Sequence, residues 1–159
     1  MKNYYTKMKL PEPLVPALQA LSLLKGQTAL VTGANSGIGR AIAVSLGRAG
    51  ANVVVNYVVK PEEAEAGEIQ GGGGHATAIR ADVGDEAQVV AMFAEAVKAF
   101  GTVDILVSNA GMERNAPFHE MTTAQWDAVM DVNLRGAFLC AREAVREFLR
   151  RGVRPEVSV

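Results

Sequence analysis

The segment at residues 28–50, TALVTGANSGIGRAIAVSLGRAG, most restricts the fold of this chain. It begins with a short apolar run, TALVT, that suits a buried parallel strand. Three glycines follow at Gly33, Gly37 and Gly39, and apolar residues then recur at helical spacing until Gly50. A strand, a glycine turn and a helix in this order build a phosphate site, because the helix N-terminus presents unpaired amides and the positive end of its dipole to the anion.

Each glycine of this turn has its own expected task. Gly33 lets the chain turn sharply, Gly37 lets the bare backbone approach a ligand, and Gly39 lets the helix sit close to the strand. A glycine pattern alone also fits a tight strand-to-helix turn without a ligand. The candidate ligand contacts of the turn are Gly33, Asn35, Ser36, Gly37, Ile38 and Gly39.

Composition narrows the class of protein. The chain has 159 residues, 49% hydrophobic and 21% charged, with a formal net charge of −1. These values describe an ordinary globular domain and carry no basic footprint for nucleic acid. No run reaches the roughly 20 apolar residues that span a bilayer, so we expect no membrane partner. The single cysteine, Cys140, excludes an internal disulfide and favours a reducing, cytoplasmic location.

The first 26 residues differ from the rest. Lysines precede an apolar segment there, as in a secretory signal, but Pro11, Pro13 and Pro16 interrupt it and no small-residue cleavage site follows. We interpret residues 1–26 as an N-terminal arm that ends in a short helix over 14–24. The domain itself is expected over 27–159.

Strand and helix patterns alternate along the rest of the chain. Further strands are predicted over 52–57, 75–80 and 103–108, and helices over 61–69, 86–100 and 123–151. This alternation predicts an α/β fold with a doubly wound parallel sheet of strand order 3-2-1-4. Ligands of such sheets bind at the carboxyl ends of the strands where the order reverses, here between the first and fourth strands.

Side chains outside the glycine turn predict one helix start and no metal site. Thr122 and Gln125 have the spacing of a capping box and place the start of the last helix. Trp126 on that helix is interpreted as a core residue, like the methionines. His75 and His119 have no partners at metal-ligand spacing, so no metal site is predicted.

The glycine turn resembles a known family. TGANSGIG is similar to the TGxxxGIG cofactor turn of the classical short-chain dehydrogenase/reductase family. Three later matches follow in the order of that family: Asp82-Val83 after the third strand, Ser108-Asn109-Ala110-Gly111 where the family has NNAG, and Asn133 in VNLRGAFLC. The resemblance covers residues 27–151, and the Asn56-Tyr57 pair after the second strand makes the chain look similar to the glucose-dehydrogenase-like members.

The resemblance implies a Rossmann-like fold and an NAD(P)-dependent oxidoreductase. Such enzymes transfer hydride between nicotinamide and a small-molecule alcohol or carbonyl substrate. It implies that Asp82 and Val83 contact adenine, that Asn109, Ala110 and Gly111 line the cofactor site, and that Asn133 is catalytic, supporting a water in the proton relay.

The end of the second strand bears on the choice of cofactor. An acidic residue there would bind the ribose 2′-hydroxyl of NAD and repel the 2′-phosphate of NADP. This chain has Asn56 and Tyr57 instead, which we include among the cofactor contacts, while Arg40 or Lys60 could neutralise a 2′-phosphate. NADP is slightly favoured, and NAD remains the alternative.

The catalytic Ser, Tyr and Lys of the family follow a fifth strand, and this sequence has no counterpart of them. Tyr5 and Lys9 fit the YxxxK spacing but lie in the arm, and Ser158 is too close to the end of the last helix. We therefore expect an amino-terminal part of such an oxidoreductase, truncated after about four strands and inactive alone. A non-catalytic nucleotide-binding or regulatory module is the alternative. An uncovered strand edge and helix face also predict a self-associating chain or homo-oligomer.

Overall fold

The central strand β1 (Thr28–Val31) is buried along its whole length in a parallel sheet. It pairs with β2 (Asn52–Tyr57) on one side and with β4 (Ile105–Val107) on the other, while β3 (Ala76–Arg80) pairs with β2. The four strands have the order β3-β2-β1-β4, which confirms the predicted order and the Rossmann-like arrangement.

The computed structural model describes residues 22–59 and 75–155. The predicted helix over 61–69, Lys60, Tyr5, Lys9 and Ser158 lie outside these residues, as does most of the helix expected over 14–24. No helix within the described ranges is long and apolar enough to cross a membrane.

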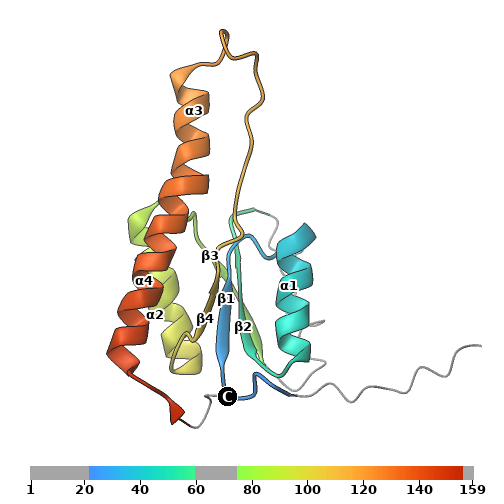
Figure 1. Cartoon of the computed structure of the whole chain (residues 1–159), viewed down its shortest axis with the longest axis vertical. Helices are drawn as coiled ribbons and strands as arrows, with labels where there is room; N and C mark the ends of the chain where they lie inside the picture. The colour runs from blue at the N-terminus through green and yellow to red at the C-terminus, as the bar shows by residue number, and fades with distance from the viewer. Residues whose placement is uncertain (1–21, 60–74, 156–159) are drawn as a thin grey trace, which may run out of the picture.

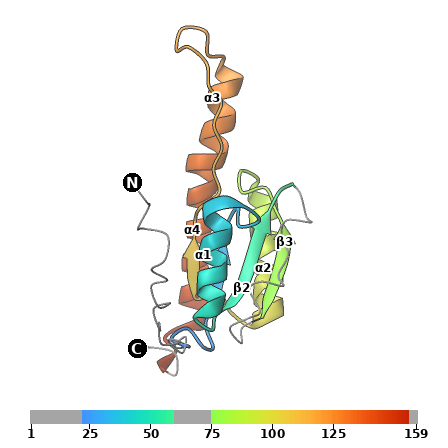
Figure 2. The ribbon, with the colours of Figure 1, turned by 90° about the vertical axis from the view of Figure 1, so that its right-hand side faces the viewer.

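Helices cover both faces of the sheet. α1 (Gly37–Arg48) lies against one face, and α2 (Glu86–Phe100) and α4 (Gly136–Arg151) lie against the other (Figure 1). Seen from the side in Figure 2, α1 stands in front of the sheet. Because side chains alternate along a strand, Leu30 faces α2 and α4 while Val31 packs toward α1.

Local sequence signals set the helix ends. Asp85 caps α2, because its Oδ1 accepts hydrogen bonds from the amides of Ala87 and Gln88. Gly101 ends the same helix with φ of 82°, a left-handed conformation that favours glycine. Asp85 and Gly101 thus mark the start and the end of the helix that connects β3 with β4.

The predicted helix over 123–151 is continuous but contains a π-helical turn that the sequence pattern did not predict. α3 (Thr123–Met130) continues through a π-helical turn (Asp131–Arg135) into α4. The capping box at its start is confirmed, with Thr122 Oγ1 accepting from the Gln125 amide and Gln125 Oε1 accepting from the Thr122 amide. A π-helical turn takes one residue more per hydrogen-bonded ring, and such turns often occur at functional sites.

Trp126 is not a core residue, contrary to its interpretation from the sequence. Its side chain is 54% exposed. α3 projects beyond the end of the sheet together with the loop that precedes it (Figure 1), so none of the four described strands lies beneath it to bury an indole. The helical periodicity of residues 123–151 predicted an apolar face, but it could not show which other elements would pack against that face.

The fourth strand is shorter than the predicted range 103–108. Val103 and Thr102 are buried before it begins, while the three residues of β4 are only partly buried. β4 pairs with β1 alone among the described strands and forms the edge of the sheet. Its incomplete burial follows from that edge position.

Candidate functional site

A crevice of about 840 Å³ opens at the carboxyl ends of the strands. It lies between the turn after β1 and the turn after β4, where the strand order predicts a ligand site. Most of the predicted cofactor contacts line it together: Gly33, Asn35, Ser36, Gly37, Ile38, Gly39, Asp82, Val83, Asn109, Ala110 and Gly111.

The glycines of the turn have the geometry that their spacing predicts. Gly33 and Gly37 have φ of 61° and 55°, in the left-handed region that side chains rarely adopt. A Cβ on Gly39 would come within 2.5 Å of both Asn109 Nδ2 and the Gly33 carbonyl oxygen. The start of α1 can therefore lie against the turn only because it has no side chain there.

The N-terminus of α1 leaves its first amides available to a ligand. Ser36 is the N-cap residue, but its side chain makes no capping hydrogen bond, and the first turn of α1 carries no acidic residue. The amides and the positive end of the helix dipole thus face the crevice with no carboxylate in the first turn of α1 to compete for them. This arrangement fits the phosphate groups of a nucleotide.

Asn109 joins the two turns that form the crevice. Its Nδ2 donates to the carbonyl oxygens of Thr32 at 2.9 Å and Gly33 at 3.2 Å. The amides of Asn109 and Ala110 both donate to Thr32 Oγ1 at 2.9 Å. The glycine turn and the Asn109-Ala110-Gly111 turn thus meet between the first and fourth strands, where the strand order predicted a ligand site.

Asp82 and Val83 form the wall that follows β3. Asp82 Oδ1 accepts from the Gly84 amide at 2.9 Å, and the Asp82 amide donates to Gln88 Oε1 at 3.0 Å. Val83 is buried against Gly136, where a Cβ would come within 2.7 Å of a Val83 methyl. Local hydrogen bonds and close packing with α4 therefore hold this wall.

Asn56 and Tyr57 do not line the crevice, although they were included among the cofactor contacts. Asn56 is 1% exposed, and within the described residues its side chain bonds to backbone groups: Oδ1 accepts from the Gly33 amide, and Nδ2 donates to the carbonyls of Ile79 and Ala81. Tyr57 is half-buried and packs with the α1 side of the core. Asn56 therefore has almost no exposed surface for a direct cofactor contact, while the contact expected of Tyr57 stays a prediction.

Five lining residues were not singled out from the sequence: Val58, Val59, Met112, Arg114 and Val132. The first two follow β2 directly, so the strand's predicted end at residue 57 was the signal that could have found them. Asn35 Nδ2 donates to the Val59 carbonyl oxygen at 3.1 Å and ties the glycine turn to this segment. For the loop residues Met112 and Arg114 no sequence signal was available.

Charge is sparse in the crevice. Among its described lining residues only Asp82 and Arg114 carry a formal charge. Arg40, considered for a 2′-phosphate, does not line the crevice; it lies with Arg48 along a neighbouring hollow on α1 that shares Gly37 with the crevice. The edge formed by Asn35, Val58 and Val59 is therefore neutral, and favours neither a free ribose hydroxyl nor a phosphate by charge.

Asn133 lies in the π-helical turn and contacts the loop after β4. Its Oδ1 accepts from the Met112 amide at 2.8 Å, and its Nδ2 donates to the Met112 carbonyl oxygen at 2.9 Å. It does not itself line the crevice, whereas Val132 beside it does. Asn133 is therefore connected to the lining through Met112, which it holds by two hydrogen bonds.

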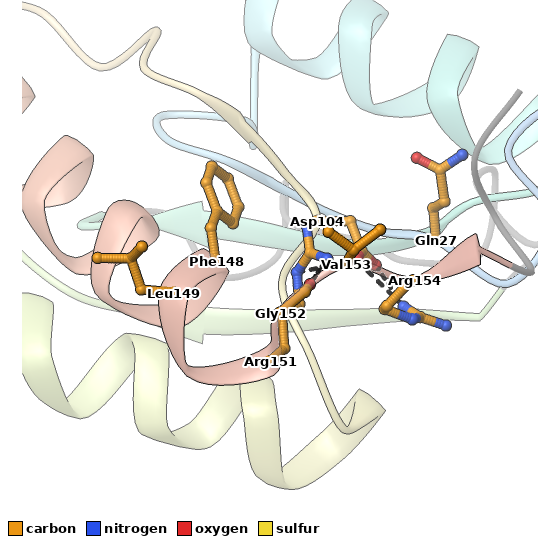
Figure 3. A pocket seen from close by; sticks show the side chains of 8 residues that line it. All are labelled: Gln27, Asp104, Phe148, Leu149, Arg151, Gly152, Val153 and Arg154. Atoms are coloured by element: carbon orange, nitrogen blue, oxygen red, sulfur yellow. Dashed lines mark hydrogen bonds and ion pairs between the residues drawn. The ribbon is translucent and has the colours of Figure 1, made fainter.

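A second hollow, of about 500 Å³, lies at the opposite end of the sheet (Figure 3). The Asp104 carboxylate dominates it, accepting from the Thr28 amide at 2.8 Å and pairing with Arg154 at 3.0 Å and Arg151 at 3.4 Å. Because this carboxylate is already engaged by two guanidinium groups and an amide, we assign the cluster a structural role.

Comparisons with known proteins agree with the fold and the crevice. A family model described as short chain dehydrogenase matches residues 27–154. A short chain dehydrogenase of Claviceps purpurea is 48% identical over 131 residues, 81% of this chain and 50% of that protein. One of Passalora fulva is 46% identical over 131 residues, 81% of this chain and 49% of that protein.

Solved structures show the same relationship. A short-chain type dehydrogenase/reductase from Mycobacterium marinum matches with a TM-score of 0.79 and 36% identity, covering 84% of this chain and 53% of that one. The chain spans about half the length of the curated relatives it matches. The glycine turn, the Asp82-Val83 wall and the Asn109 turn stand together in one crevice of a matching fold, and the chain belongs to the short-chain dehydrogenase family.

Proposed function

We propose that this chain is the nucleotide-binding part of an NAD(P)-dependent oxidoreductase that transfers hydride between nicotinamide and a small-molecule alcohol or carbonyl substrate. The observation that carries the proposal is the crevice beside the uncapped N-terminus of α1. The helix amides and Gly37 would hold the pyrophosphate, while Asp82, Val83 and Ala110 would form the adenine side. The bound cofactor would supply the hydride acceptor or donor.

By itself the chain is proposed to be inactive. The sequence contains no counterpart of the family's catalytic Ser, Tyr and Lys at the expected place. Asn133, which the family resemblance makes part of the proton relay, would contribute by fixing the Met112 loop at the crevice. The nucleotide-binding residues alone support binding without turnover.

A non-catalytic nucleotide-binding or regulatory module is the second candidate. It is favoured by one observation: the groups that bind a nucleotide are assembled within the described residues, although the catalytic counterparts are missing from the sequence. The two candidates predict the same crevice. They differ in whether a longer polypeptide carrying the catalytic residues is made in the source organism, which intact mass would decide.

The finer assignments follow from the same residues. We favour NADP slightly, since within the described residues no acidic side chain stands at the edge formed by Asn35, Val58 and Val59 to repel a 2′-phosphate, and NAD is the alternative. A cytoplasmic location fits the single buried cysteine. Self-association fits the exposed apolar side chains of α3 and α4, and the arm over 1–26 is proposed to precede the domain over 27–159.

The test is nucleotide binding by calorimetry with a matched pair of glycine variants. Gly37 and Gly101 both have positive φ, and a Cβ at either would meet no atom within 4 Å. Gly37→Ala and Gly101→Ala therefore impose similar backbone strain, on the order of 1–2 kcal/mol. Of the two positions only Gly37 lines the crevice, so Gly37→Ala should weaken NADP binding while Gly101→Ala should not.

Two outcomes decide the proposal. Saturable binding of NADP or NAD by the wild type, weakened only by Gly37→Ala, supports the nucleotide site. No binding by a folded wild-type chain, or equal losses in the two variants, would remove the basis for it. A dehydrogenase assay on the same protein is expected to show no turnover.

A further inference from the structure

Two asparagine side chains, one at the carboxyl end of each neighbouring strand, bind the backbone of Gly33. Asn56 Oδ1, at the end of β2, accepts from the Gly33 amide at 3.2 Å. Asn109 Nδ2, after β4, donates to the Gly33 carbonyl oxygen at 3.2 Å. Because Gly33 has φ of 61° and begins the glycine turn, these two bonds fix the direction in which the chain leaves β1.

Asn56 also reaches the opposite wall of the crevice. Its Nδ2 donates to the carbonyl oxygens of Ala81 at 3.0 Å and Ile79 at 3.4 Å. Ala81 directly precedes Asp82 in the sequence. The backbone carbonyl oxygen of Asn56 accepts from the Ala34 amide at 2.8 Å. One buried side chain therefore connects the glycine turn to the segment that leads into Asp82 and Val83.

The chemistry at this place calls for a neutral amide. The site requires one acceptor, for the Gly33 amide, and donors for two carbonyl oxygens, and a carboxamide supplies both. A carboxylate would set a negative oxygen against two carbonyl oxygens inside the protein. A shorter side chain would leave the buried backbone groups without partners.

We infer that Asn56 is a positioning residue for nucleotide binding: it sets the spacing between the glycine turn and the Asp82-Val83 wall without touching the ligand. This inference rests on the proposed function, since it concerns the same crevice. Asn56 was expected from the sequence to contact the cofactor directly, and its 1% exposure assigns it this indirect role instead.

The substitution Asn56→Asp tests the inference through its pH dependence. The protonated carboxyl can accept from Gly33 and donate to Ala81, while the ionised form can donate to neither carbonyl. The side-chain bonds of Asn56 go to backbone groups of Gly33, Ile79 and Ala81, which have no titratable side chains. Burial raises the pKa of such a carboxyl, so it should titrate between about pH 5 and pH 8.

We expect NADP and NAD to bind Asn56→Asp roughly tenfold more weakly at about pH 8, and close to wild type near pH 5. Asn56→Ser, which is neutral and too short, should bind weakly at both pH values. The matched control is Asn52→Asp on the same strand. Asn52 Oδ1 accepts from the His75 amide at 3.2 Å at the far end of β2, so this variant should bind like wild type.

Amide hydrogen exchange supplies a readout that needs no ligand. The Gly33 amide should be protected in the wild type and should exchange faster in Asn56→Ser, with circular dichroism verifying the fold. Folded Asn56→Asp and Asn56→Ser proteins that bind both nucleotides like wild type would overturn the inference. If the wild type binds neither nucleotide, the proposed function is wrong, and so is the role of Asn56 in nucleotide binding. The exchange rate of the Gly33 amide would then show only whether Asn56 stabilises the glycine turn.

Discussion

Asn133 binds the backbone of Met112 through both polar atoms of its side-chain amide, at 2.8 and 2.9 Å. The two residues come from the π-helical turn and from the loop after β4, so this contact fixes the loop against the long helix. A Cβ on Gly111, the preceding residue, would lie 3.5 Å from Asn133 Oδ1. The asparagine therefore controls where the chain runs as it leaves the crevice.

The first prediction concerns this contact. Asn133→Ala removes both hydrogen bonds and should lower the free energy of unfolding by about 1–2 kcal/mol, because partly solvated backbone groups lose their partners. It should also weaken NADP binding and speed hydrogen exchange of the Met112 amide. Asn115→Ala, in the same loop at an exposed position, is the control. Unchanged exchange at Met112 in Asn133→Ala would contradict the prediction.

The neutral edge of the crevice should be convertible into a selective one. Val58→Arg places a cation beside residues expected to face the adenosine ribose and should favour NADP over NAD by roughly tenfold. Val58→Asp should reverse that preference, since a carboxylate repels the 2′-phosphate. Both ratios come from competition titrations, with Val90→Arg on the outer surface of α2 as the control. Equal effects on the two nucleotides would show that Val58 does not face the 2′ position.

Acid sensitivity should depend on Glu147. Its carboxylate accepts from Arg150 Nε at 2.6 Å and Nη2 at 2.7 Å, and this side-chain hydrogen bonding lowers the pKa of Glu147 below its usual 4.5. A lowered carboxyl pKa contributes stability that is present above the unfolded-state pKa and is lost as the pH falls through the folded-state value.

The wild type should therefore lose thermal stability as the pH falls below 4.5, and Glu147→Gln should lose less over that window while being less stable at neutral pH. Differential scanning calorimetry across the pH series measures both effects. Glu95→Gln, at an exposed position on α2, is the matched control and should follow the wild type. Parallel pH curves for Glu147→Gln and wild type would argue against the mechanism.

Self-association should depend on one face of the long helix. The exposed large apolar side chains of α3, the π-helical turn and α4 are Trp126, Leu134, Phe138, Val145 and Leu149. Burying such surface contributes about 25 cal/mol per Å² and favours association. The double variant Leu134→Glu with Leu149→Glu should shift the protein toward monomer in sizing chromatography with light scattering.

Val90→Glu is the control for that experiment, since Val90 is an exposed apolar residue on α2, outside this face. Its oligomeric state should match that of the wild type. A wild-type chain that remains monomeric at every concentration, with cooperative melting, would refute the association prediction.

The sequence predicted the parts of the molecule that depend on local chemistry. Alternation of strand and helix patterns predicted the order β3-β2-β1-β4, and the glycine spacing predicted a turn that φ at Gly33 and Gly37 confirms. Thr122 and Gln125 marked the start of α3 correctly. The turn and the helix start are each encoded within a few residues, and the strand order follows from the alternation of such local patterns along the chain.

The predictions for Asn56 and Trp126 were wrong because they depend on tertiary contacts with residues that are distant in the sequence. Asn56 stands at a strand end where a ligand contact is reasonable, but the direction of its side chain depends on the positions of Gly33 and Ala81. Trp126 has the spacing of a core residue on a helix that extends past its sheet. Local sequence patterns determine neither the direction of the Asn56 side chain nor how far α3 extends beyond the sheet.

The exposed position of Trp126 gives the protein a built-in optical reporter. It is the only tryptophan in the sequence, and it stands on α3, outside the residues that line the crevice. Its fluorescence should shift to shorter wavelength when the apolar helix face is covered. A nucleotide entering the crevice should leave that emission maximum in place. Association and cofactor binding can thus be followed as separate signals on the unlabelled, unmutated chain.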